Sequence, residues 1–467
     1  MTSEWGRDQK DVTTQLFETL DQAKVSSFHR RVVILAALGP FSDAFNEFGV
    51  SASLVAVGIL FHLSPILLSV VVASYWVGVA AGGFLGGIIS DLIGRRTLFI
   101  YDTLGMALFA ILSSLSFNGI FYFIMRMLLG FFIGLDYAAA VPLVSEYAPP
   151  QIRGELLSIE KVFFKLGGLT TIGLSLLLAV TVSPLIAWRI DFLAAAIVPL
   201  ILFFLRKNIP ESLRWAIDVG DINKAKSIAE YLKKFGFKIN ENILNSMIIA
   251  NQKFSYKELL KEFFSSKNRK VLLYIFWISS GYALTVNLAS VYGTRIFQLL
   301  GATATESLAA TLISAFFGLF GIILMLFIVD KIGRKITGIL GFILTMFSSL
   351  LFLIPYILHS ITIPIAILAI GLIYFFDVGL VGTLMYIPSV ELTMSRVRGT
   401  TIGWDKLFEF GLALPALTLY AYLGLKYSFI LEIILSAIFA LGTWILSIDV
   451  TGKSLEEAVK IAWGTKI

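Results

Sequence analysis

The chain has 467 residues, of which 57% are hydrophobic and 15% charged, and it contains no cysteine. Water-soluble domains use about 25% charged residues, so this composition excludes a water-soluble globular protein, a disordered chain and a disulfide-rich secreted protein. The net charge of +6 comes from basic residues that cluster between long apolar stretches. This pattern indicates a polytopic membrane protein embedded in a lipid bilayer, and it predicts no nucleic-acid partner.

A helix needs about 20 mostly apolar residues to cross a bilayer, and the sequence contains twelve such stretches. The first six are predicted at 32–60, 66–91, 97–117, 120–145, 156–181 and 186–206. The second six are predicted at 271–299, 306–329, 337–358, 363–390, 400–424 and 427–448. The predicted fold class is therefore all-α, with twelve transmembrane helices in two pseudo-symmetric six-helix bundles.

Five segments follow from these stretches. They are a cytosolic N-terminal tail (1–28), an N-terminal bundle (29–206), a cytosolic helical linker (207–270), a C-terminal bundle (271–448) and a cytosolic tail (449–467). Lys and Arg gather in the tails, the linker and alternate loops, and such clusters mark the cytoplasmic side. Both termini are therefore predicted to lie in the cytoplasm, with the chain in the cell membrane.

Two short patterns occur once in each half of the sequence. An aspartate followed by Gly-Arg comes after the second and eighth stretches, and a glutamate followed seven residues later by Arg-Gly comes after the fourth and tenth. The residues are Asp91, Arg95, Glu146 and Arg153 in the first half, and Asp330, Arg334, Glu391 and Arg398 in the second. These repeats indicate an internal duplication, and parallel repeats with a substrate site between them are a transporter architecture.

Further motifs accompany this duplication. They are Arg126-x-x-x-Gly130-x-x-x-Gly134, the segment 141–154 that ends in Arg-Gly, Pro-Glu-Ser-Leu-Arg-Trp at 210–215, and Thr-Gly-Lys-Ser-Leu-Glu-Glu at 451–457. Taken together, and over essentially the whole chain, they resemble the major facilitator superfamily in its branch of sugar porters and metabolite:proton symporters. The resemblance implies alternating access, no enzymatic activity, protons as the coupling ion with no other cofactor, a small-molecule substrate and a monomer.

The resemblance also implies a conformational latch on the cytoplasmic side. Asp91, Arg95, Glu146 and Arg153 would form one set, and Asp330, Arg334, Glu391 and Arg398 its twin. The residues alone allow a simpler interpretation, in which the arginines are retained on the cytoplasmic side and the acids merely neutralise them.

Charged residues inside apolar stretches are costly and mark functional sites. Asp43 and Glu47 lie four residues apart and therefore share one helix face, while Arg126 and Asp136 lie on the fourth stretch. The sugar-porter pattern places the proton-coupling acid at Glu47, and Arg126 would modulate it. The pattern of phosphate-type symporters favours Asp43 and Asp136, so all three acids remain candidates.

The substrate site predicted from the resemblance differs from that of a hexose carrier, because Lys161 stands where sugar porters have a binding glutamine. The candidate substrate-binding residues are Tyr137, Lys161, Lys165, Tyr282, Asn287, Tyr386, Trp404, Lys406 and Glu409. The two lysines on the fifth stretch favour a substrate with an anionic group. The predicted function is transport of a sugar, a sugar acid or another organic anion by proton-coupled symport.

Several alternatives remain open. Within transporters, they are a phosphate:proton symporter and an uncoupled sugar facilitator. Outside transporters, they are a membrane receptor and a membrane enzyme, but the three histidines are scattered and no metal-binding motif is present. No metal site is predicted.

Overall fold

The computed structural model describes residues 15–239, 256–265 and 268–464, and within these ranges the chain forms helices without a strand. The chain divides into two compact units. Unit 1 comprises residues 1–268, 390–403 and 452–467, and unit 2 comprises residues 269–389 and 404–451.

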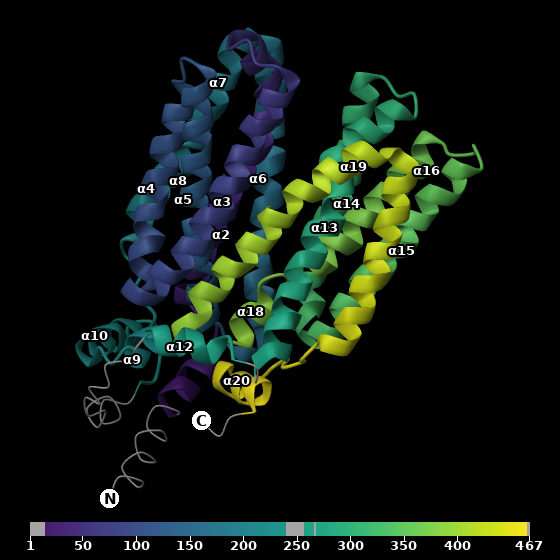
Figure 1. The fold of residues 1–467 in the computed structure, drawn as a ribbon. Coiled ribbons are helices and arrows are strands. Elements are labelled where there is room, and N and C mark those ends of the chain that lie inside the picture. The colour runs from purple at the N-terminus through teal and green to yellow at the C-terminus, as the bar shows by residue number, and fades with distance from the viewer. Residues whose placement is uncertain (1–14, 240–255, 266–267, 465–467) are drawn as a thin grey trace, which may run out of the picture. The chain divides into compact units, whose positions relative to one another are not determined.

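Unit 1 is built on long helices that run alongside one another (Figure 1). α3 packs against α5, α2 against α6, and α4 against both α5 and α8. The helices are α2 (Ser27–Leu60), α3 (Pro65–Ile93), α4 (Arg95–Ser114), α5 (Gly119–Tyr147), α6 (Arg153–Thr181), α7 (Pro184–Ala195) and α8 (Ile197–Arg206). Shorter ones follow: η1 (Pro150–Ile152), α9 (Leu213–Asp218), α10 (Ile222–Lys233), α12 (Tyr256–Phe263) and, near the C-terminus, α20 (Leu455–Trp463).

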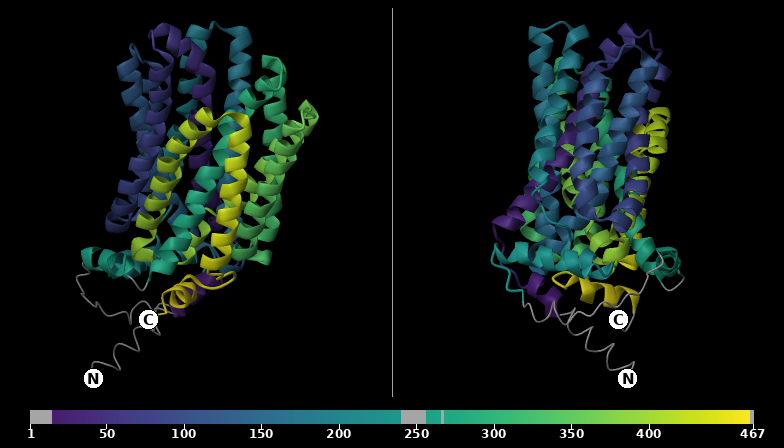
Figure 2. Two further views of the ribbon diagram at one scale, coloured as in Figure 1. Left: turned by 45° about the vertical axis from the view of Figure 1, so that its right-hand side comes forward. Right: turned by 90° about the vertical axis from the view of Figure 1, so that its left-hand side faces the viewer.

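Unit 2 contains the later long helices, drawn in green to yellow in Figure 2. They are α13 (Arg269–Leu299), α14 (Ala304–Ile332), α15 (Arg334–Ile357), α16 (Ile363–Ile373), the π-helix η3 (Tyr374–Val381) and α17 (Gly382–Leu384). α18 (Ile387–Glu391) and α19 (Ser395–Leu446) each contribute residues to both units. α14 and α15 both pack against η3.

The predicted fold class is confirmed, because every predicted apolar stretch overlaps one of these helices or a consecutive set of them, with ends that differ by up to three residues at 97–117, 337–358 and 427–448. Within the described residues, nine helices are long and apolar enough to cross a membrane. The stretches outside that set include α2, which carries Asp43 and Glu47, and the first half of α19, which carries Lys406 and Glu409.

Two of the predicted stretches are interrupted. The stretch at 186–206 is split between α7 and α8, and the stretch at 363–390 includes the π-helix η3. α19 covers both of the last two stretches, but Gly424 has a φ of 68° and separates them. π-Helical turns occur frequently at functional sites, and η3 contains the buried Asp377.

The distribution of side chains is the reverse of that in a water-soluble protein. Large apolar side chains such as Phe204, Phe327 and Trp444 are exposed, whereas Arg126 and Arg206 are among the largest fully buried side chains. An apolar exterior suits contact with lipid, and buried charges in such a protein must find polar partners inside.

Glycines determine how closely α3 and α5 approach one another. A Cβ atom on Gly130 would lie 2.1 Å from the carbonyl oxygen of Tyr75, and one on Gly134 would lie 2.3 Å from that of Val79. Small residues at such crossings allow membrane helices to pack backbone against backbone. The Arg-x-x-x-Gly-x-x-x-Gly motif therefore places the α5 side chains that follow it close to α3.

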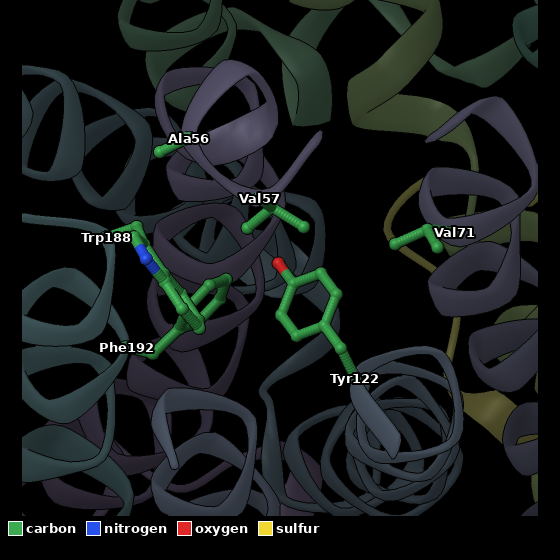
Figure 3. Close-up of a cluster of buried hydrophobic side chains, with 6 residues drawn as sticks. All are labelled: Ala56, Val57, Val71, Tyr122, Trp188 and Phe192. Atoms are coloured by element: carbon green, nitrogen blue, oxygen red, sulfur yellow. The ribbon is translucent and has the colours of Figure 1, made fainter. Parts of the chain in front are cut away.

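An apolar cluster surrounds part of α5 in unit 1. It consists of Ala56, Val57, Val71, Tyr122, Trp188 and Phe192. Figure 3 shows the Trp188 and Phe192 rings alongside one another and the Tyr122 hydroxyl directed toward Val57. Ring centroids of Tyr122 and Trp188 are 5.8 Å apart. This cluster adjoins the functional region, because the guanidinium of Arg126 lies 5.1 Å from the Phe192 ring centroid.

The compact units differ from the predicted segments at two places. Residues 390–403 and 452–467, which were predicted as parts of the C-terminal bundle and tail, belong to unit 1. The reason is a set of ion pairs and hydrogen bonds, described below, that ties these residues to α3, α5 and α9. The predicted boundaries 29–206 and 271–448 otherwise stay predictions.

Candidate functional site

The carboxyl group of Asp43 lies at the centre of a buried polar cluster in unit 1. Its Oδ1 accepts a hydrogen bond from the Tyr75 hydroxyl at 2.6 Å, and its Oδ2 accepts one from the Tyr137 hydroxyl at 2.8 Å. Asp43 is fully buried and is contributed by α2, Tyr75 by α3 and Tyr137 by α5. One carboxyl group therefore links three helices, and two of these three residues were predicted site residues.

Arg126 lies next to this cluster without forming an ion pair in the described part of the chain. Its guanidinium carbon is 4.4 Å from the Tyr75 ring centroid, and Nη2 donates to the carbonyl oxygen of Asn46 at 3.2 Å. Its Nε and Nη1 have no hydrogen-bond partner within the described residues. A buried arginine with unused donors is costly, so this group is ready to bind an additional acceptor.

Glu47 lies one helical turn beyond Asp43 and is half-buried. It interacts electrostatically with Arg126 and with Lys165 of α6. Lys161 is buried one turn before Lys165 on the same helix, and the two lysines also interact electrostatically. The structure therefore brings Asp43, Glu47 and Arg126 together with the two lysines predicted to bind substrate.

Asp136 has a different environment from the other two acids. It forms an ion pair with Arg206 of α8, and Asp102 of α4 lies 3.3 Å from the same Arg206 nitrogen. Arg206 also donates to the carbonyl oxygens of Leu35 and Phe99. These contacts of Arg206 link α8 to α2, α4 and α5. The assignment of Asp136 to proton coupling stays a prediction.

Loop residues from both copies of the duplicated motifs meet in a second polar network of unit 1. Asp91 pairs with Arg95 at 3.0 Å, and Arg95 lies 3.5 Å from Glu146. Glu146 pairs with Arg398 at 2.8 Å and accepts a hydrogen bond from the Ser395 hydroxyl at 2.7 Å. A pattern from the first half of the sequence thus contacts its counterpart from the second half.

Ion pairs join the two predicted sets of latch residues to one another, and their role as a latch stays a prediction. Glu146 pairs with Arg398, and in the same way Arg153 pairs with Glu391 at 3.9 Å, so each glutamate contacts the arginine of the other repeat. Asp330 and Arg334 form their own pair at 2.7 Å in unit 2. Partner exchange between the duplicated motifs leaves each of these loop charges opposite an unlike charge.

Three network residues carried no predicted role. Arg214 of α9 pairs with Asp21 at 2.8 Å and with Glu456 of α20 at 2.9 Å. Burial alone lowers the pKa of Arg214, but the ion pairs with Glu456 and Asp21 offset burial and raise this pKa above its ordinary value. The motifs at 210–215 and 451–457 pointed to Arg214 and Glu456, whereas nothing in the sequence distinguished Asp21.

Glu211 is a fourth such residue, and it caps the start of α4. Its carboxylate accepts hydrogen bonds from the backbone N–H groups of Arg95 at 3.0 Å and Arg96 at 3.2 Å. Burial raises the pKa of Glu211, and these N–H donors act in the opposite direction. A carboxylate at a helix N-terminus is favourable, so the Pro-Glu-Ser motif attaches the linker to the loop between α3 and α4.

Unit 2 contains the remaining predicted substrate residues. The Lys406 amine lies 2.8 Å from the Glu409 carboxylate, which also accepts a hydrogen bond from the Tyr386 hydroxyl at 3.2 Å. The same amine bonds to the Tyr386 hydroxyl, and it lies 5.2 Å from the Phe410 ring centroid. These three predicted residues therefore form one compact group.

The other predicted residues of unit 2 are aromatic or lie outside the description. Tyr282 is half-buried on α13, next to Gly382 of α17. The Trp404 ring is 6.1 Å from the Phe276 ring, so it packs against α13. The side chain of Asn287 lies outside the described residues.

Apolar helices that enclose charged and hydroxyl-bearing side chains, together with duplicated loop motifs, define a membrane transporter. The chain belongs to the family described as "Sugar (and other) transporter", whose model matches residues 31–462. The chain is therefore a transporter of the major facilitator superfamily and not an enzyme, as the resemblance implied.

Individual relatives agree with this assignment. The chain is 27% identical to the arabinose-proton symporter of Bacillus subtilis (strain 168), over 97% of this chain and 99% of that protein. It is 25% identical to the niacin transporter NiaP of Acinetobacter baylyi, over 83% of this chain and 86% of that protein. The fold is similar to that of the proton:xylose symporter XylE bound to 6-bromo-6-deoxy-D-glucose, with a TM-score of 0.80, 21% identity, and coverage of 92% of this chain and 98% of XylE.

Proposed function

We propose that the protein is a proton-coupled symporter that moves a small hydrophilic metabolite (a sugar, a sugar acid or another organic anion) by alternating access. It would lie in the cell membrane with both termini in the cytoplasm, because basic residues gather in the tails and the linker. The observation that carries the proposal is the buried Asp43 carboxyl group, which links α2, α3 and α5 beside Arg126.

Asp43 fits the role of proton carrier because its hydrogen bonds depend on its charge. As a carboxylate it accepts from both the Tyr75 and Tyr137 hydroxyls. A protonated carboxyl group has its own hydrogen to donate, so protonation would break or reverse one of these bonds. The cation of Arg126 over the Tyr75 ring favours the ionised form. Loading a proton would therefore alter the packing of three helices.

Glu47 fits the substrate side of the same site. It interacts electrostatically with Arg126 and Lys165, and it is half-buried, whereas Asp43 is fully buried. A substrate anion near Lys161 and Lys165 would compete with Glu47 for these cations. Such competition would link substrate binding to the protonation of the acids on α2.

The names of the relatives indicate two substrate classes. The arabinose-proton symporter points to a pentose or another sugar, and the niacin transporter points to an organic carboxylate. Lys161 and Lys165 support an anionic group on the substrate, since two cations on one helix face suit a carboxylate better than a neutral hydroxyl. A sugar acid satisfies both indications.

Uptake into proteoliposomes tests the proposal. The purified protein is reconstituted, an inward proton gradient is imposed, and accumulation is measured for pentoses, hexoses, sugar acids, nicotinate and phosphate. One proton per substrate allows about tenfold accumulation for each pH unit. Asp43→Asn should lose accumulation but retain exchange of substrate across the membrane. Equilibration that is independent of pH would instead show an uncoupled facilitator, and accumulation of phosphate alone would show a phosphate symporter.

A further inference from the structure

Three buried carboxyl groups of unit 2 converge on one stretch of α13. Asp405 Oδ1 lies 2.6 Å from the Ser279 hydroxyl, and Asp377 Oδ1 lies 2.9 Å from the Thr285 hydroxyl. The Tyr420 hydroxyl lies 2.7 Å from the carbonyl oxygen of Leu284 and 2.9 Å from Glu432 Oε2. The α13 residues in these contacts lie within 279–285, which include the predicted substrate residue Tyr282, and Glu432 reaches this stretch through Tyr420.

Asp377 and Glu432 have no cationic partner in the described part of the chain. Both are fully buried, with 0% of the side chain exposed. Asp377 Oδ2 and Glu432 Oε1 have no hydrogen-bond partner among the described residues. An ionised carboxylate in such surroundings would cost several kcal/mol. By contrast, Asp405 is adjacent in sequence to Lys406.

The helices packed against η3 supply no charge that could balance Asp377. Between Glu306 and Asp330, near the two ends of α14, there is no ionisable residue, and the same is true between Lys335 and Tyr356 of α15. α16 and α17 contain none. On α13, Tyr282 lies three residues before Thr285, and Arg295 lies near the far end and is exposed.

The groups that do interact with Asp377 are acidic or phenolic. Glu432 and Tyr420 of α19 both interact electrostatically with Asp377, and Tyr374 lies one turn away on η3. Two carboxyl groups that share a buried region cannot both be ionised without strong repulsion. Asp377 and Glu432 therefore constitute a pair that needs hydrogen ions for charge balance.

The hydrogen bonds lead to the same conclusion. A hydroxyl group has one hydrogen to donate, yet the Thr285 hydroxyl lies 2.9 Å from both the Gly281 carbonyl oxygen and Asp377. The Tyr420 hydroxyl is shared in the same way between Leu284 and Glu432. Both contacts of each hydroxyl are hydrogen bonds only if the carboxyl group is the donor in one of them.

We propose that Asp377 and Glu432 form a second proton-binding site, in the C-terminal bundle and separate from Asp43. Their protons hold the 279–285 stretch of α13 in the packing that positions Tyr282 for substrate. The protonation of Asp377 and Glu432 is inferred from their burial and hydrogen bonds, whereas its link to substrate binding rests on the proposed symport. When the pair is deprotonated, the two carboxylates repel one another, and the substrate-binding conformation is lost.

Infrared difference spectroscopy tests the protonation directly. Spectra of the full chain in liposomes at neutral pH are compared for the wild type, D377N and E432Q. Each variant should lose one band of a protonated carboxyl group, and this band should shift in deuterated water. Glu306→Gln is the matched control, because Glu306 is an exposed helix-capping acid and its loss should remove a carboxylate band only. Loss of carboxylate bands in D377N and E432Q would overturn the proposal.

The pH dependence of substrate binding tests the link to function. The substrate is the one identified by uptake. If binding requires the pair to be protonated, the wild-type dissociation constant rises about tenfold per pH unit for each site that titrates. In D377N and in E432Q, the slope of log Kd against pH should fall by about one unit. Tyr420→Phe keeps both acids and serves as a second variant if an amide substitution prevents folding; its slope should match the wild type at neutral to alkaline pH.

The outcomes separate this proposal from the proposed function. Failure of a proton gradient to drive uptake by the wild type would refute symport, and the infrared bands of Asp377 and Glu432 would still be present. An unchanged slope in both amide variants would overturn the link between the pair and substrate binding. Binding that strengthens with sodium only when Asp377 is present, without a protonated-carboxyl band, would overturn the proton site in favour of a sodium site.

Discussion

The network around Asp91 predicts a large effect for the replacement of one oxygen atom. In the wild type, the Asp91 carboxylate accepts hydrogen bonds from the Gly399 N–H at 3.0 Å, the Thr400 N–H at 2.7 Å and the Thr400 hydroxyl at 2.7 Å. It also pairs with Arg95 at 3.0 Å. Asp91→Asn removes the charge and turns an NH₂ group toward at least one of these donors.

The magnitude follows from burial. Removal of one partner from a buried ion pair costs about 3–5 kcal/mol, and the Asp91 side chain is fully buried in this network. A change of 1.36 kcal/mol corresponds to a tenfold change in an equilibrium constant. The contact between α3 and residues 399–400 should therefore open at least about a hundredfold more often. Thr400→Val, which removes only the hydroxyl donor, should cost about 1.5–3 kcal/mol and serves as the graded control.

The absence of cysteine from the chain allows a direct measurement. Thr401→Cys introduces a single thiol at a position that is fully buried beside this network. Its labelling by a membrane-permeant maleimide should be slow in the parent, faster with Thr400→Val, and fastest with Asp91→Asn. Substrate uptake by Asp91→Asn should be slower, with normal insertion into the membrane. Equal labelling and equal initial uptake in all three proteins would refute the latch role of Asp91.

Two further predictions concern the short helices outside the long bundles. Burial raises the pKa of Asp218 to about 6. Between about pH 4 and 6 the native state therefore binds more protons than the unfolded state, and the free energy of unfolding falls as pH rises. Relative to Asp218→Asn, the wild type should lose about 1–3 kcal/mol of stability over this range, and identical pH profiles of Tm in detergent would contradict this. Asp21→Asn removes the ion pair with Arg214, so residues 15–21 should exchange amide hydrogens about tenfold faster, for a cost of about 1.5 kcal/mol. Replacement of the exposed Glu18 by Gln is the control and should have no effect. Equal exchange in both variants would show that the Asp21 pair contributes nothing.

The local part of the structure could be read from the sequence because its causes are local. Length and hydropathy located each membrane helix, since about 20 consecutive apolar residues are needed wherever the chain crosses the bilayer. Spacing placed Asp43 and Glu47 on one face of α2. Gly94 and Gly333, with φ of 103° and 83°, form equivalent turns before α4 and α15, in agreement with the internal duplication that the Gly-Arg pattern indicated.

The partners of the buried charges could not be read in the same way. Glu146 meets Arg398, which is 252 residues away, and Asp136 meets Arg206 on another helix. Such pairs depend on which helix faces pack together, and the sequence of a single stretch does not specify which helices pack against it. Asp377 lies inside an apolar stretch of the sequence, but its association with Glu432 emerged only from the packing of η3, α13 and α19, as did the lack of a cationic partner for both among the described residues.

The sequence by itself determined that the chain is a duplicated membrane transporter and which ionisable residues lie inside it, because the bilayer imposes the same length and polarity on every crossing helix. The tertiary structure decided which of those residues act together. Electrostatic and hydrogen-bond energies depend on distances of a few ångströms between different helices, and these distances are set only when the helices pack.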